Sequence, residues 1–402
     1  MFDFIRRVCS YQNYKLFKEQ NGSTKVLLNL EKLDDRFVPS ITSVDFRVPT
    51  VTNNDQGSSS NAASADGTYV SVWQHRFSES DIDIKAQLFN SNGSRRGGEI
   101  IVANTTRLET QPDVAMDDSG DWKVVWTDTA GSNDNIKVAS FNSNGLRRRS
   151  DFYVANTTKN EYNPSIAVSR LGDFVVSYTL DFSSSDQDIL ARRYSDTGIF
   201  SSQISVAATT ARESFSCVAC GIGNDSSFAI AYQINNDIAL RRYSSWGALT
   251  STLIVANGSN IQERPSVSYD KYGRSVVAWQ EYRNGDYDIL CRTISANGFM
   301  GGVIFVENSS PDALRPSVIM DRNIGTFAVT YSTNTQVFVR EFNFNGTPRS
   351  TNLFVGFTGN FTTSPAISIN NSGFYFITYT AQNRFGDLGL GVYARFGRLQ
   401  DI

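Results

Sequence analysis

The sequence predicts an all-β fold built from seven similar four-stranded units, and three observations support this prediction. An aromatic residue repeatedly closes a β-type run and is followed at once by a small polar residue, at Trp73-Gln74, Trp126-Thr127, Tyr178-Thr179, Tyr232-Gln233, Trp279-Gln280, Tyr331-Ser332 and Tyr379-Thr380. These pairs recur every 47 to 54 residues, which suits a four-stranded propeller blade and is too long for one turn of a β-helix. The copies also share one order of strand-like runs and turns. We therefore predict a seven-bladed β-propeller.

The second copy shows the elements of one unit in order. Its four strand-like runs, called a to d, are Pro112–Asp117, Asp121–Thr127, Asn135–Phe141 and Asp151–Ala155. A turn through Gly120 joins runs a and b as a hairpin. A polar loop leads to run c, and a turn that ends at Gly145 reverses the chain into run d.

The other copies repeat this design with local variations. Run a opens with Pro164, Pro265, Pro316 or Pro365 and is followed by a turn glycine at Gly172, Gly273, Gly325 or Gly373. We place each proline at the first position of its strand, where no ladder hydrogen bond is lost. The first and fourth copies are degenerate, with Ser59 and Cys217 near the proline position and Ser226 in place of the glycine.

The recurring aromatic residues are predicted to fill the core between neighbouring blades. One face of run a carries small residues, namely Ala115, Ala167, Ser268 and Ser368, which leaves room for large side chains of the next blade. A ring of stacking platforms for sugars is the competing interpretation. An aromatic residue at a fixed strand position more often packs inside, so we favour the core.

The two ends of the chain are predicted to complete one sheet. The last copy ends at Ile402 after its run c, Gly391–Phe396, and has no run d. Near the other end, Val44–Val48 matches the pattern of run d and is expected to pair with this run c, which closes the ring. The domain prediction is therefore a flexible leader over residues 1–40 and a single propeller over residues 41–402.

Composition and charge exclude several classes of protein. The 402 residues carry a formal charge of −3, so no net field favours nucleic acid or acidic lipid as a partner. No apolar run is long enough for a transmembrane helix.

The four cysteines do not recur between copies, and the odd spacing of Cys217 and Cys220 in a strand points their side chains to opposite faces. We expect free thiols rather than a redox or zinc site, and a monomeric protein.

Two resemblances bear on location. Leu30–Ser40 resembles the L-E-x-L-E-x-R-x-x-P-S leader of many exported bacterial proteins, with Asp34 in place of the second Glu. The repeat unit P-[SD]-[VI]-A, D-x-x-G-x-[FW]-V-V-x-[WY], D-I-x-x-R-x-[FY], V-A-N resembles a β-propeller repeat of large exported bacterial proteins, over about residues 44–402. This resemblance implies an extracellular or cell-surface location and a binding role. It carries over no catalytic residues.

Candidate ligand-binding residues gather in the b–c loops and at the start of run c, at the end of the units that also holds the d–a loops. They are Asp83, Asp128, Asp188, Asp237, Glu281 and Asp288. Their oxygens are the ligands that Ca²⁺ prefers, although capping of local turns explains the same pattern. Calcium is therefore one candidate cofactor, and no other is expected.

Other polar residues give weaker signals. His75 is the one histidine, so a zinc site or a Ser-His-Asp triad has little to build on. We expect it in a solvated loop. Arginines cluster in the c–d turns at Arg95-Arg96 and Arg147–Arg149 and along run c at Arg192-Arg193 and Arg241-Arg242. They fit either an anionic glycan or, more simply, solvated turn charges.

The preferred interpretation is a non-enzymatic binding or adhesion module that uses the loops on one rim to bind a surface glycan or a protein. The alternative is a propeller-type carbohydrate-active enzyme, a glycoside hydrolase or lyase, because glycosidase chemistry needs only two carboxylates. A scaffold that spaces other components is the third option. Two carboxylates at the mouth of a central pocket would favour the enzyme, and a lining of Ser and Ala would favour binding.

Overall fold

The computed structural model describes residues 45–183, 185–221, 226–309, 311–359, 363–382 and 389–399. They belong to one compact unit that spans residues 39–402. The described residues form 28 strands and no helix, which confirms the all-β prediction. The predicted leader, residues 1–40, lies outside the described residues, as does Val44 of the predicted closing strand.

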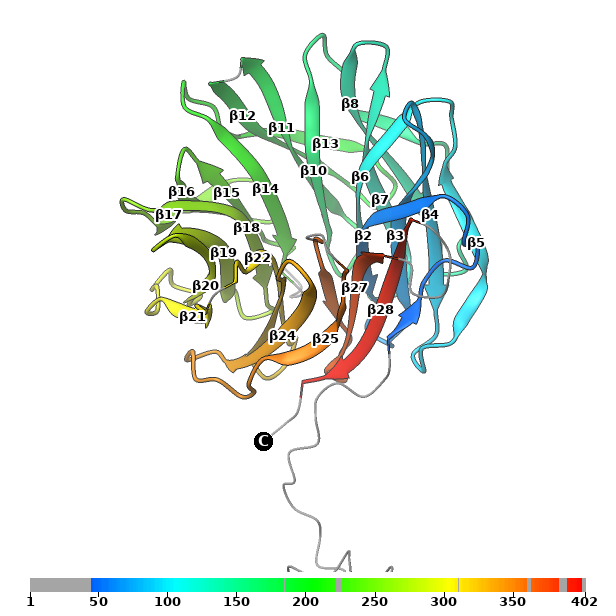
Figure 1. Ribbon diagram of the computed structural model, residues 1–402. Helices are drawn as coiled ribbons and strands as arrows, with labels where there is room; N and C mark the ends of the chain where they lie inside the picture. Colours follow the sequence, from blue (N-terminus) through cyan, green and yellow to red (C-terminus); the bar gives the residue numbers. More distant parts are fainter. Residues whose placement is uncertain are drawn as a thin grey trace, which may run out of the picture. The chain divides into compact units, whose positions relative to one another are not determined.

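The strands follow one another in chain order as groups of four antiparallel neighbours (Figure 1). The a strands are β2 (Asp55–Ala63), β6 (Leu108–Met116), β10 (Glu161–Val168), β14 (Glu213–Cys220), β18 (Ile261–Tyr269), β22 (Leu314–Met320) and β26 (Ala366–Ile369). The b strands are β3 (Tyr69–Ser78), β7 (Trp122–Ala130), β11 (Phe174–Ser183), β15 (Phe228–Ile234), β19 (Ser275–Arg283), β23 (Thr326–Ser332) and β27 (Phe374–Gln382).

The c strands are β4 (Asp81–Phe89), β8 (Asn133–Phe141), β12 (Asp186–Tyr194), β16 (Asp237–Tyr243), β20 (Asp286–Ile294), β24 (Gln336–Asn343) and β28 (Leu390–Arg398). The d strands are β5 (Arg95–Ala103), β9 (Phe152–Ala155), β13 (Phe200–Ala207), β17 (Leu249–Ala256), β21 (Ile304–Glu307), β25 (Leu353–Phe357) and β1 (Phe46–Arg47). Groups β2–β5 and β6–β9 form one eight-stranded sheet, because Ile82 and Leu108 make a single parallel pair. The other groups are four-stranded sheets.

Strand β1 pairs with β28, as the sequence predicts for the two ends of the chain. Phe46 lies opposite Ala394 and Arg47 opposite Tyr393, and the amide of Val48 donates to the carbonyl of Val392 at 2.9 Å. The sheet order is therefore β1-β28-β27-β26. In Figure 1 the blue strand β2 and the red strand β28 lie side by side, in agreement with their contacts.

Each a strand contacts the a strand of the next group along the chain. Strand β26 of the last group contacts β2 of the first. The side-chain amide of Asn61 in β2 donates to the carbonyl of Ala366 in β26 and to Oγ1 of Thr378 in the adjoining β27, both at 2.9 Å. The a strands of all the groups thus contact one another in succession.

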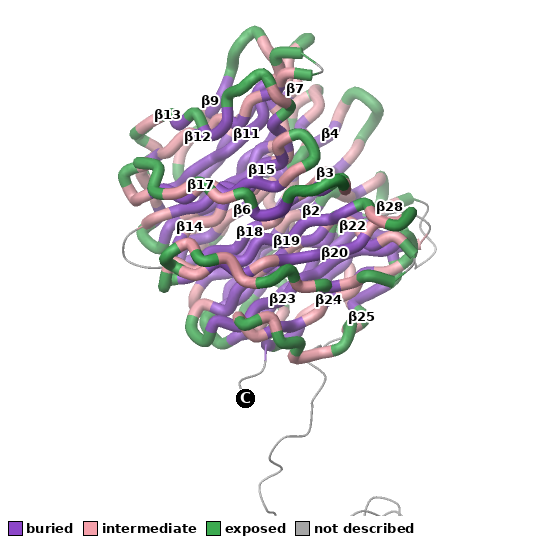
Figure 2. Tube along the Cα trace, turned by 90° about the vertical axis from the view of Figure 1, so that its left-hand side faces the viewer, coloured by how far each residue is buried: buried purple, intermediate pink, exposed green. Residues whose placement is uncertain are grey.

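The predicted core aromatics are buried, with exposed fractions of 0 to 3% for Trp73, Trp126, Tyr178, Tyr232, Trp279, Tyr331 and Tyr379. Each of the last six lies in a hydrophobic cluster that it shares with the preceding group; Trp126, for example, packs with Val70 and Leu88 of the first group. Trp73 shares its cluster with Phe376 and Val392 of the last group. Figure 2 shows the buried residues running along the strands, with exposed residues at the loops. The aromatic side chains therefore bind neighbouring sheets together by burying apolar surface.

The valine of the repeated V-A-N motif marks a β-bulge in the d strand. At Val255, for example, Ile238 pairs with Ala256 and Ala239 with Ile254, so Val255 has no partner in its own ladder. The carbonyls of these valines accept hydrogen bonds from arginines of the next group. Among the described residues the donors and acceptors are Arg147 to Val102, Arg192 to Val154, Arg241 to Val206, Arg292 to Val255, Arg340 to Val306 and Arg395 to Val355.

The same contact joins the sheet that contains β1 and β28 to the first group. Val48, which follows β1, is buried, and its carbonyl accepts from Nε of Arg95 in the first group at 3.4 Å. The arginines that the sequence suggests for glycan binding, Arg192 and Arg241, thus have structural partners. They satisfy carbonyls that a bulge leaves out of the ladder.

Candidate functional site

A cavity of about 310 Å³ lies where the a strands of consecutive groups meet. Strands β6, β10, β14, β18 and β22 and the segment before β26 line it. The residues that precede the recurring prolines, or stand in equivalent places, contribute side chains of different chemistry: Gln111, Asn163, Phe215, Arg264, Arg315 and Ser364. This cavity is the candidate functional site.

A β-bulge in each a strand builds this lining. The register shifts at the same place in the a strands of the first six groups, and there Ser58, Gln111, Asn163, Phe215, Arg264 and Arg315 have φ between 48° and 54°. A left-handed conformation is uncommon for residues other than glycine and costs free energy. It persists here because the surrounding strands hold it in place.

The prediction that proline opens run a is wrong. Pro112, Pro164, Pro265 and Pro316 all lie inside their strands, directly after the left-handed residue. Each strand therefore begins earlier than predicted. Proline is tolerated inside the strand because the bulge already removes that position from the ladder, so its missing N–H costs no hydrogen bond.

The small polar residue after each b-strand aromatic holds the bulge in several groups. Oγ1 of Thr127 donates to Oε1 of Gln111 at 3.0 Å, and Oε1 of Gln280 accepts from the amide of Arg315 at 2.8 Å. Oγ of Ser332 donates to the carbonyl of Thr363 at 2.7 Å. The aromatic–polar pair thus has two roles: the aromatic packs between groups, and the polar residue fixes the cavity lining.

The residue after the proline position joins neighbouring a strands. Asp113 accepts from Oγ of Ser60 at 2.7 Å, from Oγ of Ser165 at 3.1 Å and from the amides of Ile166 and Val114 at 2.9 and 3.0 Å. Burial raises the pKa of Asp113, and these four donors oppose that effect. Asp113 is the one carboxylate among the described residues that line the cavity, and it is fully occupied by structural contacts.

The cavity carries positive charge on one side. The guanidinium of Arg264 lies 4.5 Å from the centre of the Phe215 ring, and Nη1 of Arg315 donates to Oγ of Ser364 at 3.0 Å. None of the ion pairs found among the described residues includes either arginine. Burial, followed by the charge of Arg264, lowers the pKa of Arg315.

The predicted rim carboxylates lie near the ends of the b and c strands. The structure places one of them, Asp128, opposite the buried Glu109 in the pairing of β6 with β7. Burial, together with the charges of Asp128 and Asp83, raises the pKa of Glu109. Asp128 is fully buried and contacts Arg107 at 3.3 Å, Lys137 at 3.4 Å and the hydroxyl of Tyr153 at 3.2 Å. Local partners therefore occupy Asp128.

The other four rim residues lie in three further groups. Glu281 and Asp288 face each other across β19 and β20; Glu281 accepts from Asn260 at 2.7 Å and from the Trp279 indole at 3.2 Å. Burial and nearby carboxylates raise the pKa of Asp188 and of Asp288. Asp237 begins β16 opposite Ile234. These residues form local pairs and do not converge on one point, so ligand binding by the six carboxylates stays a prediction.

No group of three or more His, Cys, Asp or Glu side chains is arranged to hold a metal ion in the described part of the chain. Within the same residues, no helix is long and apolar enough to span a membrane.

The prediction that His75 lies in a solvated loop is wrong. It lies within β3, and its exposed fraction is 1%. Cys217 and Cys220 are free thiols that pack against two different hydrophobic clusters, which confirms that they point to opposite faces.

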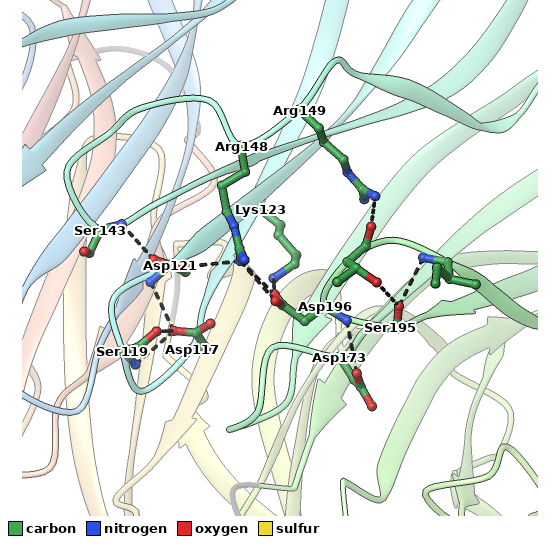
Figure 3. Close-up of polar contacts among 12 residues, drawn as sticks. Asp117, Ser119, Asp121, Lys123, Ser143, Arg148, Arg149, Asp173, Ser195 and Asp196 are labelled. Atoms are coloured by element: carbon green, nitrogen blue, oxygen red, sulfur yellow. Dashed lines mark hydrogen bonds and ion pairs between the residues drawn. The ribbon is translucent and has the colours of Figure 1, made fainter.

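The arginines of the second c–d turn are mostly engaged in a network between the second and third groups (Figure 3). Nη1 of Arg148 lies 2.9 Å from Asp121 and 3.0 Å from Asp196, and the buried Lys123 contacts Asp196 at 3.0 Å. Burial would raise the pKa of Asp196, but the hydrogen bonds and charges of Lys123 and Arg148 lower it. This end of the two groups is therefore held together by charge pairs.

The sequence did not single out the cavity-lining side chains, in particular Arg264, Arg315 and Phe215. A signal for them was present, since each stands directly before the P-S-V motif or its equivalent. Only the left-handed bulge turns that position toward the cavity.

Comparison with known proteins identifies the fold. No protein-family model matches the chain, and no curated protein matches it. Solved structures similar to it include a protein of unknown function from Dyadobacter fermentans DSM 18053, with a TM-score of 0.55 and 9% identity over 90% of this chain and 100% of that one. A second is the polysaccharide lyase Uly1, with a TM-score of 0.51 and 11% identity over 87% and 91% of the two chains.

A third is the Penicillium chrysogenum α-L-arabinanase complexed with arabinobiose, with a TM-score of 0.52 and 9% identity over 89% of this chain and 98% of that one. At these identities the likeness shows the fold alone. Together with the four-stranded antiparallel sheets, it establishes that the chain has a β-propeller fold.

Proposed function

We propose that this protein is a non-enzymatic, extracellular or cell-surface module that binds a glycan in the cavity of a closed seven-bladed β-propeller. The observation that carries the proposal is the cavity itself, which side chains from consecutive a strands line with mixed aromatic, amide and guanidinium groups. Ligand sites are concave and combine apolar surface with a few converging polar groups.

Closure with seven blades is supported by interactions that recur from group to group. The a strands contact one another in succession, including β26 with β2. The bulge valine of each d strand accepts from an arginine of the next group, and Val48 accepts from Arg95 of the first group. A ring in which every group meets the next by the same contacts explains both patterns.

A saccharide ligand is supported by the lining and by proteins of similar fold. Aromatic and planar amide or guanidinium side chains suit sugars, which offer apolar ring faces and hydroxyl groups. Phe215 supplies an aromatic ring, and Gln111 and Asn163 supply amides. Two of the similar structures are a polysaccharide lyase and an arabinanase complexed with arabinobiose.

The lining favours binding over the alternative, a glycoside hydrolase or lyase. Most glycosidases use two carboxylates about 5 to 9.5 Å apart. Within the described residues the cavity offers only Asp113, whose oxygens already accept four hydrogen bonds. An acid or a nucleophile must be free to exchange a proton or attack the substrate.

Export is proposed from the resemblance of Leu30–Ser40 and of the repeats to exported bacterial proteins. A surface glycan would be the natural partner there. The rim carboxylates, such as Asp288, would then be secondary contacts around the cavity, with or without Ca²⁺.

The proposal can be tested by screening the full chain on a glycan array and against soluble polysaccharides, with and without calcium. We expect binding without release of reducing ends or unsaturated products.

Replacement of Phe215 by Ala should weaken binding of a glycan found in this screen about tenfold, a loss of about 1.4 kcal/mol. The matched control is Trp246→Ala, which removes an aromatic residue that is 83% exposed and outside the cavity lining. Product release by the wild-type protein would favour the enzyme, and an equal loss in both variants would move binding away from the cavity.

A further inference from the structure

Arg264 and Arg315 are neighbouring positive charges in the cavity wall. They come from equivalent bulge positions of the adjacent strands β18 and β22. Among the described residues, no carboxylate forms an ion pair with either guanidinium. Two like charges that are partly withdrawn from water repel each other and lose hydration, so an arrangement of this kind is unfavourable without a partner.

The fold holds both arginines in place despite this cost. Their φ angles are 53° and 54°, and each precedes a proline, which further restricts the residue before it. The amide of Arg315 is fixed by Gln280, whose Nε2 donates to Oε1 of Glu263 at 2.7 Å. Phe215 supports the Arg264 guanidinium from one side, which leaves its N–H edge available.

Two acidic side chains, Asp113 in the lining and Glu263 next to Arg264 in the chain, already have hydrogen-bond donors. Glu263 accepts from Gln280, and Asp113 accepts four hydrogen bonds on the other side of the cavity. Neither contacts a cavity arginine in an ion pair. The structure therefore offers guanidinium donors, a size suited to a small sugar residue, and no internal counter-ion in the described residues.

We propose that Arg264 and Arg315 form an anion-binding subsite that takes the carboxylate of an acidic saccharide, of the uronic acid class. This inference rests on the proposed function and adds the chemical class of the ligand. Guanidinium groups bind carboxylates through two parallel N–H···O bonds, which a neutral sugar cannot accept in the same way. The amides of Gln111 and Asn163, on the opposite side, would face the hydroxyl groups of the same sugar.

The test compares tri-galacturonic acid with its methyl ester, which has the same sugar skeleton without the charge. Binding to the full-length protein is measured by calorimetry. We expect the acid to bind at least 100-fold more tightly than the ester. In the double variant Arg264→Gln/Arg315→Gln the acid should bind as weakly as the ester. In Arg264→Lys/Arg315→Lys, which keeps the charge but loses the planar fork, the loss should be about tenfold.

The matched control is Arg76→Gln/Arg96→Gln, which makes the same change in net charge at two arginines that do not line the cavity. It should bind the acid like the wild type. Equal affinity for acid and ester, or unchanged binding in the cavity double variant, would overturn the anion subsite and leave the proposed function standing.

If neither saccharide binds, the proposed function fails for this ligand and the subsite is tested separately with inorganic sulfate. A sulfate-dependent rise in thermal midpoint that is present in the wild type and absent in Arg264→Gln/Arg315→Gln would support the subsite. The same rise in both proteins would overturn it.

Discussion

Asp83 and His75 face each other across strands β4 and β3, and both side chains are buried. Burial, together with the charge of Asp81, raises the pKa of Asp83 to about 6, while Lys85 opposes the shift. Burial, followed by the charge of Lys85, lowers the pKa of His75. Sequence spacing suggests an exposed rim for both residues, but the structure buries both, and the His75 ring packs against Phe77. At this scale the environment decides which acids can ionise.

The raised pKa of Asp83 predicts a pH-dependent cost to stability. Between about pH 4 and pH 6 the folded state keeps a proton that the unfolded state has lost, so the free energy of unfolding falls as pH rises through this range. Asn cannot ionise, and Asp83→Asn should therefore gain about 2 kcal/mol relative to wild type between pH 4 and pH 7. Urea unfolding at several pH values measures this difference. Glu79→Gln, at a side chain that is 95% exposed, is the control and should show no such gain. A constant difference across the range for Asp83→Asn would contradict the prediction.

The d strand shows how a repeated motif joins neighbouring elements. The buried valine of V-A-N forms a bulge, and an arginine of the next group donates to its carbonyl. The bond is 2.6 Å for Arg292 to Val255 and 2.7 Å for Arg340 to Val306. The motif D-I-x-x-R-x-[FY] thus has a structural role that its charge alone does not suggest. Removing the donor leaves a buried carbonyl without a partner.

Arg292→Gln should lower the free energy of unfolding by about 1 to 3 kcal/mol, because the Val255 carbonyl then stays unsatisfied. Chemical denaturation of the variant and wild type gives the difference. Arg76→Gln removes an arginine whose ion pair with Glu79 is exposed, and it should cost less than about 1 kcal/mol. If the two substitutions cost the same, the bond between strands contributes no more than an exposed ion pair.

For the whole unit, the short strand β1 is expected to matter far beyond its two residues. Phe46 packs at 5.8 Å from the rings of both Phe89 and Phe396, which belong to the first and last groups. Val48 is completely buried in the same cluster. Residues at the start of the described chain therefore connect the groups at its two ends, as closure of the proposed ring requires.

Removal of residues 1–50 should lower the free energy of unfolding by at least about 3 kcal/mol relative to removal of residues 1–40. The physical reasons are the lost burial of Val48, which is complete and contributes about 1.5 to 3 kcal/mol, the lost packing of the partly buried Phe46, and the exposed edge of β28. Thermal and urea unfolding of the two shortened chains measure the difference. Removal of residues 1–40 serves as the control because it leaves β1 in place. Equal stability of the two would argue against closure by this strand.

Local sequence patterns predict four strands per group and the aromatic core, although the a strands begin earlier than expected. Alternating patterns, glycine turns and the repeat interval are local signals, and the structure confirms the four strands of the second copy and the burial of residues such as Trp126 and Tyr331. Ser226, which replaces a turn glycine, even adopts φ of 49°. The pairing of Val48 with Val392 was also predictable, because a missing strand at one end matched an extra one at the other.

The cavity and its chemistry were decided only by the tertiary structure. Asp128 is buried and forms ion pairs with Arg107 and Lys137, which come from other segments around the same group. Whether Arg264 lies beside Arg315 depends on which groups become neighbours and on a bulge that turns one residue per a strand inward. Arg264 and Arg315 are about one repeat apart in the sequence, and no periodic pattern within a strand records that they are neighbours. A repeating sequence specifies the repeated scaffold, whereas the differences between repeats acquire meaning only when the fold brings them together around one space.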